Sequence, residues 1–159
     1  MLIAESLPQN EGILLANDLC QRGVDTRTVA DQDIEAAVAQ VDSVLVGGDA
    51  VTRDHLLNKV GTRRAVMKAR EMGIPAYAIV QTFKTVPPEW PLFLERQAPA
   101  DVDPEAVEEK GAPIFELTPL DAFAAVFSEE GLLTRERLTE IRSELGSVEL
   151  MPAIDLVRP

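Results

Sequence analysis

Residues 41–62, VDSVLVGGDAVTRDHLLNKVGT, decide the fold that this sequence predicts. They begin with an apolar and β-branched run, Ser43–Val46, which stops at the double glycine Gly47–Gly48. A short apolar run bounded by glycines is typical of a buried strand in a parallel sheet. Polar residues follow, and a helical pattern begins at Gly61–Thr62. We therefore expect a strand, then a polar loop at its carboxyl end, then a helix.

The same alternation of strand and helix continues on both sides of this stretch. Apolar spacing predicts strands over Leu2–Ala4, Val24–Ala30 and Ala76–Val80, and helices over Glu11–Arg22, Asp31–Gln40 (with Asp31 as cap) and Gly61–Met72. Glycine commonly ends a helix, and Gly23 and Gly73 stand at two of the predicted ends. Alternating elements with short connections imply right-handed crossovers and a mostly parallel sheet flanked by helices. The predicted class is therefore α/β.

The alternation is lost after Lys84. Residues 85–111 are rich in proline and acidic residues, so a loop is expected there. Two aromatic residues of this loop, Trp90 and Phe93, either fill an apolar groove or anchor a partner.

Weaker patterns follow towards the C-terminus. We expect an edge strand over Pro113–Leu117 and two short helices over Asp121–Phe127 and Thr134–Leu145, the second capped by Thr134. The expected organisation is one domain over residues 1–145 and a tail over residues 146–159.

Composition narrows the possible functions. At 159 residues and 46% apolar content, the chain is expected to be a single globular domain. A net charge of −12 without any basic stretch argues against direct nucleic-acid binding. No apolar run reaches the roughly 18 residues of a membrane helix, and no leader is apparent, so we expect no membrane association and a cytoplasmic location.

The sequence predicts no metal and no cofactor. A single cysteine, Cys20, and a single histidine, His55, cannot assemble the usual metal clusters. Cys20 falls on the apolar face of a predicted helix and is expected in the core, while His55 is expected in a solvated turn. The sequence has neither a Gly-x-Gly-x-x-Gly fingerprint nor a P-loop, so a dinucleotide or NTP cradle is not supported.

Polar residues after the central strand form the candidate site. In an open α/β sheet, ligands bind beyond the carboxyl ends of the strands. Asp49 lies there and can act as a general acid or base, or hold a turn. Asn58 and Lys59 precede a helix start, whose free N–H groups favour an anion, and Lys84 can reach the same crevice. From spacing alone, a phosphate or carboxylate pocket and a structural loop both stay open.

Three segments carry a family resemblance. Residues 41–84, ending in NKVGTRRAVMKAREMGIPAYAIVQTFK, resemble the C-terminal domain of the initiation factor 2B family, as do residues 4–19 (AESLPQNEGILLANDL) and 115–138 (FELTPLDAFAAVFSEEGLLTRERL). That family includes the alpha, beta and delta subunits of the translation guanine-nucleotide exchange factor, and isomerases of ribose 1,5-bisphosphate and 5-methylthioribose 1-phosphate. The resemblance implies a Rossmann-like three-layer sandwich with a mostly parallel sheet, and a homodimer formed through this domain.

The resemblance also implies roles for five residues. In the isomerases, the acid after the central strand is the acid/base of a ring opening and a 1,2-proton or hydride shift, and Asp49 matches it. Asn58 and Lys59 match a pair that contacts substrate, and Lys84 matches a substrate-contacting lysine of the ribose bisphosphate branch. Gly48, beside the acid, is assigned to the same substrate-binding set.

Four departures from the family pattern bear on activity. Family members carry an N-terminal helical domain and a segment with a partner catalytic cysteine; the resemblance starts after that segment, and Cys20 lies in a different element. Leu7 stands where a turn arginine is expected, which removes a fixed phosphate fork. Glu11 replaces a glutamine of the methylthioribose branch, and the segment Asp49–Asn58 is one residue shorter.

Three functions are therefore considered. The first, which we expect from the departures, is a non-catalytic regulatory or binding module that retains a pocket for a small phosphorylated metabolite, either a sugar phosphate or a nucleotide. The second is an aldose–ketose isomerase of the ribose 1,5-bisphosphate type, completed by a partner chain or a dimer neighbour. The third is a structural module that binds a protein partner through Trp90, Phe93 and the closing helices.

Overall fold

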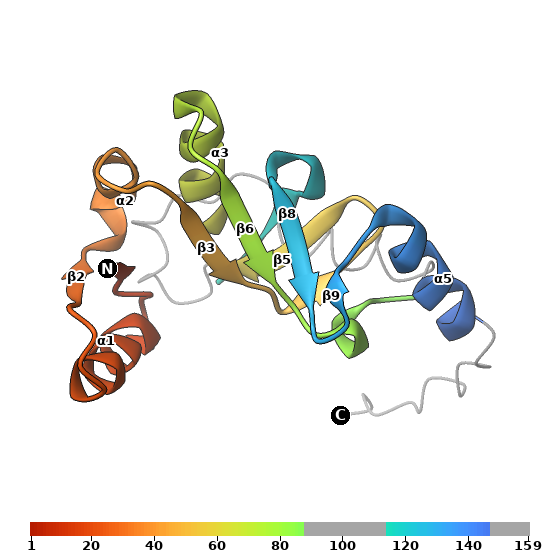
Figure 1. Ribbon diagram of the computed structural model, residues 1–159, viewed down its shortest axis with the longest axis horizontal. Coiled ribbons are helices and arrows are strands. Elements are labelled where there is room, and N and C mark those ends of the chain that lie inside the picture. The colour runs from red at the N-terminus through yellow and green to blue at the C-terminus, as the bar shows by residue number, and fades with distance from the viewer. Residues whose placement is uncertain (88–113, 147–159) are drawn as a thin grey trace, which may run out of the picture.

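The parallel strands of the structure lie in two groups (Figure 1). This computed structural model describes residues 1–87 and 114–146. One group is the pair β1 (Leu2–Ala4) and β2 (Arg27–Val29). The other has β3 (Val44–Gly47), β6 (Ala76–Ile79) and β8 (Ala125–Ser128) side by side, with the short antiparallel β9 (Gly131–Leu132) at its edge.

Helices alternate with the parallel strands as predicted, and α5 (Arg135–Gly146) follows the last strand, β9. The alternating helices are α1 (Glu11–Gln21), α2 (Ile34–Val38, after a 3₁₀ turn over Asp31–Asp33) and α3 (Thr62–Met72). Gly73 follows α3 with a φ of 71°, as expected for a glycine that ends a helix. The predicted α/β class, with parallel strands and flanking helices, is confirmed. Among the described residues, no helix has the length and apolar character that crossing a membrane requires.

One face of the larger parallel sheet forms the core. Alternate residues of β6, Ala76 and Ala78, are almost fully buried, and so are Val66 and Ala69 of α3. Apolar residues at helical spacing along α3 therefore meet the small side chains of the central strand. This packing fixes the position of the helix that begins just after Asn58 and Lys59.

The opposite face of the same sheet is apolar and exposed. It carries Leu45 of β3, Ile79 of β6 and Phe127 of β8, which are 64%, 53% and 39% exposed, and Leu132 of β9, which is 57% exposed. Strand pairing places Ile79 directly beside Phe127, and Phe127 beside Leu132. These four residues, named the open sheet face below, are turned away from α3.

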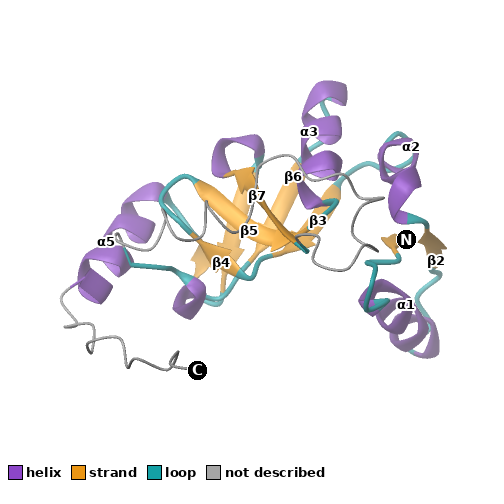
Figure 2. Ribbon diagram, turned by 180° about the vertical axis from the view of Figure 1, so that it is seen from behind, coloured by secondary structure: helices purple, strands orange, loops and turns teal. Residues whose placement is uncertain are grey.

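The segment predicted as a polar loop after the central strand is instead a hairpin, so that prediction is wrong. β4 (Ala50–Val51) and β5 (His55–Lys59) pair antiparallel, and β5 also pairs with the edge strand β7 (Phe115–Pro119) over five residues (Figure 2). Leu56 is completely buried in this sheet. His55 is the half-buried first residue of β5, opposite Pro119, rather than a solvated turn residue. The strand expected over Pro113–Leu117 is confirmed two residues later.

The helix predicted over Asp121–Phe127 is also wrong. A 3₁₀ turn covers Leu120–Ala122, and β8 follows it as an interior strand between β6 and β9. Alanine-rich sequence favours a helix locally, but pairing on both edges and burial of Val126 outweigh that preference. The last predicted helix is confirmed as α5, and the Thr134 hydroxyl accepts a hydrogen bond from the Arg137 N–H at 3.1 Å.

Cys20 is exposed, which corrects its expected place in the core. The two short strands beneath α1 cover only a narrow stripe of that helix, around Gly12 and Ala16. Trp90, Phe93 and the tail from residue 147 onwards lie outside the described residues, and the division into a domain over 1–145 and a tail stays a prediction.

Gly12 allows α1 to approach β1 closely, which yields a test of the fold. A Cβ at Gly12 would lie 1.6 Å from the Ala4 carbonyl oxygen, whereas one at Gly47 meets no atom of the described residues within 4 Å. Gly12→Ala should lower the free energy of unfolding by about 3 kcal/mol, because backbone must move to admit the methyl group. Gly47→Ala should change it by less than about 0.5 kcal/mol. Urea unfolding measures both, and equal stability of the two variants would contradict the packing.

Candidate functional site

Gly48, Asp49 and Lys84 meet at the carboxyl end of β3. The Lys84 ammonium donates to the Gly48 carbonyl oxygen at 2.7 Å and lies 3.9 Å from Asp49 Oδ1. A Cβ at Gly48 would lie 2.5 Å from Leu56 Cδ1, so the buried chain here has no room for a side chain. Asp49 is half exposed, and its carboxylate can reach a ligand in solvent. The structure therefore brings Lys84 to Asp49, where the sequence predicts a crevice.

Asn58 and Lys59 lie on β5, close to the same strand end. The Asp49 N–H donates to the carbonyl oxygen of Leu57, the residue before Asn58, at 2.8 Å. Asn58 donates through Nδ2 to Thr62 Oγ1 at 2.9 Å. Because Thr62 opens α3, this hydrogen bond ties the strand to the start of the helix.

Lys59 holds the turn that follows β1. Its ammonium donates to the Ser6 carbonyl oxygen at 2.9 Å and forms an ion pair with the Glu11 carboxylate. The Lys59 side chain is only 15% exposed, whereas Glu11 is half exposed. The hydrogen bond from Lys59 lowers the pKa of Glu11 below its ordinary value. Two of the three donors of the ammonium are therefore used by the protein itself.

Asp31 has a role that sequence reasoning missed. Its carboxylate accepts the N–H groups of Ser6 and Leu7 at 2.9 and 2.7 Å. The expectation that Asp31 caps a helix is wrong, since no side-chain hydrogen bond caps either the 3₁₀ turn or α2. Ser6 has a φ of 65°, and this unusual turn is bound by Asp31 through its N–H and by Lys59 through its carbonyl.

Glu116 is a second residue that sequence reasoning missed. It is buried on β7, opposite Asn58 in the strand register, and accepts the Arg63 N–H at 2.7 Å. Arg63 lies in the first turn of α3, where the predicted anion site offers its free amides. A carboxylate of the protein therefore already uses one of those amide donors.

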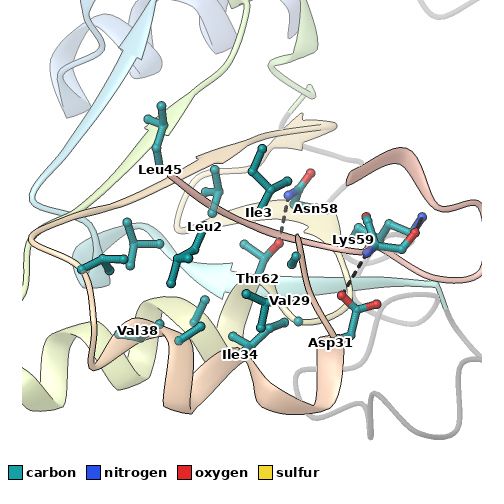
Figure 3. Close-up of a pocket in the computed structure, with 18 of the residues that line it drawn as sticks. Leu2, Ile3, Val29, Asp31, Ile34, Val38, Leu45, Asn58, Lys59 and Thr62 are labelled. Carbon is teal, nitrogen blue, oxygen red and sulfur yellow. Dashed lines mark hydrogen bonds between the residues drawn. The ribbon is translucent and has the colours of Figure 1, made fainter. Parts of the chain in front are cut away.

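A cleft of about 220 Å³ separates β1 from β3 (Figure 3). Its lining is apolar near Leu2 and Val38 and polar near Asn58, Lys59 and Asp31. Gly48, Asp49 and Lys84 do not line this cleft. Within the described residues, the predicted site therefore has two parts: the polar end of the cleft, and the Asp49–Lys84 cluster at the end of β3.

Metal-binding side chains do not gather in the part of the chain that the structure describes. No group of three or more His, Cys, Asp and Glu side chains lies close enough there to hold an ion.

Comparison with known proteins identifies the family. A model of the Initiation factor 2 subunit family (IF-2B) matches residues 1–135. The chain belongs to this family. The predicted resemblance to initiation factor 2B proteins is thus confirmed.

Relatives of the chain within the IF-2B family include isomerases. The chain is 30% identical to the ribose 1,5-bisphosphate isomerase of Methanocaldococcus jannaschii, over 81% of this chain and 44% of the relative. It is also 30% identical to the ribose 1,5-bisphosphate isomerase of Haloferax volcanii, over 91% of this chain and 48% of the relative. The chain therefore spans about half the length of these curated relatives.

Solved structures share the fold of the chain. The delta subunit of translation initiation factor eIF-2B from A. fulgidus superposes with a TM-score of 0.71 at 23% identity, over 89% of this chain and 46% of that chain. The 5-methylthioribose 1-phosphate isomerase of Pyrococcus horikoshii OT3 gives 0.70 at 20% identity, over 90% and 45%. At less than 25% identity, these two structures show that the chain shares its fold with both an initiation factor subunit and an isomerase.

Glu116 offers a test of how the helix beside the site is held. Glu116→Ala should lower the free energy of unfolding by about 2 kcal/mol, because it removes a buried charged acceptor from the start of α3. Glu71→Ala is the control, since Glu71 is an exposed residue of the last turn of α3, and it should cost less than about 0.5 kcal/mol. Thermal unfolding of both variants measures the difference. Similar melting temperatures would show that Glu116 does not hold the helix start.

Proposed function

We propose that this chain is a domain of a sugar-phosphate aldose–ketose isomerase of the ribose 1,5-bisphosphate type. The main support is the half-exposed Asp49, which has the Lys84 ammonium beside it at the end of a parallel strand. The chain is also similar in sequence to such isomerases. Because the chain matches about half the length of those relatives, we propose that the other active-site groups come from outside the matched half.

The proposed reaction suits an acid with a neighbouring cation. Converting an aldose into a ketose moves hydrogen from C2 to C1 and leaves the formula of the sugar unchanged, so no external oxidant is consumed. Asp49 would accept a proton from the substrate and return one, in ring opening or in the shift itself. Lys84 would stabilise the Asp49 carboxylate and, with Gly48, Asn58 and Lys59, contact the substrate.

The lysines near the site are important for binding a phosphate ester, because the chain as a whole is strongly acidic. With a net charge of −12, a phosphate ester approaches against an average repulsion, and local lysines must offset it. Lys59 and Lys84 come from different elements near the end of β3. Two such cations are suited to a substrate with two phosphate groups.

A second candidate is the non-catalytic module with a pocket for a phosphorylated metabolite. The observation in its favour is the ion pair of Lys59 with Glu11, which occupies the cation in the structure. Under this candidate, ribose 1,5-bisphosphate or AMP would bind without being converted.

Asp49→Asn tests the isomerase proposal. Ribose 1,5-bisphosphate turnover should fall about 10³-fold, because the variant lacks the acid–base group but keeps its shape. Asp54→Asn is the matched control, since Asp54 is an exposed acid in the turn of the same hairpin, and its activity should be unchanged. A coupled assay follows turnover of the chain alone and of the chain mixed with the unmatched half of the Haloferax volcanii isomerase. Calorimetric binding without turnover in either sample would favour the non-catalytic module.

We also propose a homodimer formed through the open sheet face. Apolar side chains gathered on one sheet face are typical of an interaction surface, and the family resemblance implies a homodimer through this domain without specifying the face. Ile79→Asp should yield monomers, because it buries an unpaired charge at the centre of that face. Leu14→Asp is the control, since Leu14 is 66% exposed on α1, away from the sheet. Light scattering after gel filtration reports the mass, and a dimeric Ile79→Asp variant would contradict the proposed interface.

A further inference from the structure

Glu11 and Lys59 form an ion pair in which the Lys59 side chain is held in place and the Glu11 side chain can move. Lys59 is largely buried and bonded to the Ser6 carbonyl, so its ammonium is fixed in place. Glu11 stands on the first turn of α1, and its half-exposed carboxylate can swing into water. Leaving the pair therefore costs the Glu11 carboxylate little, because water rehydrates it, while the largely buried Lys59 ammonium still needs an anion and can take one from a ligand.

A ligand anion and Glu11 compete for the same cation. The Lys59 ammonium has three donors, of which Ser6 and Glu11 take two. Asp31 lies at the same end of the cleft and is held by the Ser6 and Leu7 amides, so it stays in place. With Glu11 present, the charge of these three side chains is negative overall, and a phosphate group is repelled unless Glu11 leaves.

We infer that Glu11 is a specificity-determining residue: an internal counter-ion that occupies the phosphate position at Lys59 and is displaced when a phosphorylated ligand binds. The inference rests on the proposed function, because it concerns the same anion site. Its consequence is a site that binds phosphate more weakly than its cation allows. An incoming carboxylate gains nothing by replacing a carboxylate, whereas a dianionic phosphate does, so the exchange also favours phosphate ligands over carboxylates.

Phosphate titration of Glu11→Gln tests this inference. The variant keeps the shape of the side chain and removes the competing charge, so inorganic phosphate should bind about fivefold more tightly. Glu35→Gln is the matched control. Glu35 is also half exposed and pairs with a cation, Arg64, at 2.8 Å, so this variant changes the total charge equally and should leave the affinity within about twofold.

NMR shifts of the Ser6 and Gly12 amides report binding at this position, and Lys59→Ala should abolish them. If wild type and Glu11→Gln bind phosphate equally, and Lys59→Ala binds none, the anion site stands and the competitor role is refuted. An equal gain in phosphate affinity in Glu11→Gln and Glu35→Gln would also refute the competitor role, since the change in total charge of the protein would then explain both gains. If neither wild type nor Glu11→Gln binds phosphate there, both the inference and the proposed anion site fail.

Discussion

The pairing of β5 with β7 determines how the site is assembled. These strands join segments about sixty residues apart in the chain, with Asn58 opposite Glu116 and Lys59 opposite Phe115. Through this register, one strand supplies the polar residues of the cleft while its neighbour supplies the carboxylate that binds the start of α3. A shift by one residue would turn every side chain of β5 to the other face, so the register fixes both the core and the site.

Charge at the site is organised by ion pairs and backbone contacts. Lys59 binds the turn after β1, and Lys84 binds the chain after β3, each through a carbonyl oxygen with a carboxylate nearby. Both lysines therefore position backbone at the carboxyl ends of parallel strands, where ligands of open α/β sheets bind. Structural and ligand-binding roles are compatible here, because an ammonium has three donors and a carbonyl oxygen uses only one.

Sequence patterns predicted the parallel part of the fold well and the antiparallel part poorly. The strand Ser43–Val46 and the helix up to Met72 could be predicted because their apolar spacing and terminal glycines are local signals. β5 was missed because Asn58 and Lys59 lend the segment a polar character, while its pairing partner lies far along the chain. β8 was missed because alanines favour a helix until pairing on both edges outweighs that preference.

The same distinction holds for the site. Asp49, Asn58, Lys59 and Lys84 follow strand ends or precede a helix, and such places are visible in a sequence. Asp31 and Glu116 act on backbone N–H groups twenty-four or more residues away, and nothing local marks a carboxylate for such a contact. The pairing of Glu11 with Lys59 spans forty-eight residues and is likewise set by the fold.

The solvent exposure of Asp49 is consistent with the proposal that other active-site groups come from outside the matched half. Asp49 is half exposed, and in water its interaction with Lys84 across 3.9 Å is heavily screened. An acid–base group is more effective in a site without bulk water, because nearby charges and hydrogen bonds interact with it more strongly there. The part of the proposed enzyme outside the matched half would supply that environment by excluding water. In a site shielded from water, the repulsion between the Glu11 carboxylate and a phosphate at Lys59 would be stronger than in the open cleft. A bound phosphate would therefore displace Glu11 from Lys59 more completely.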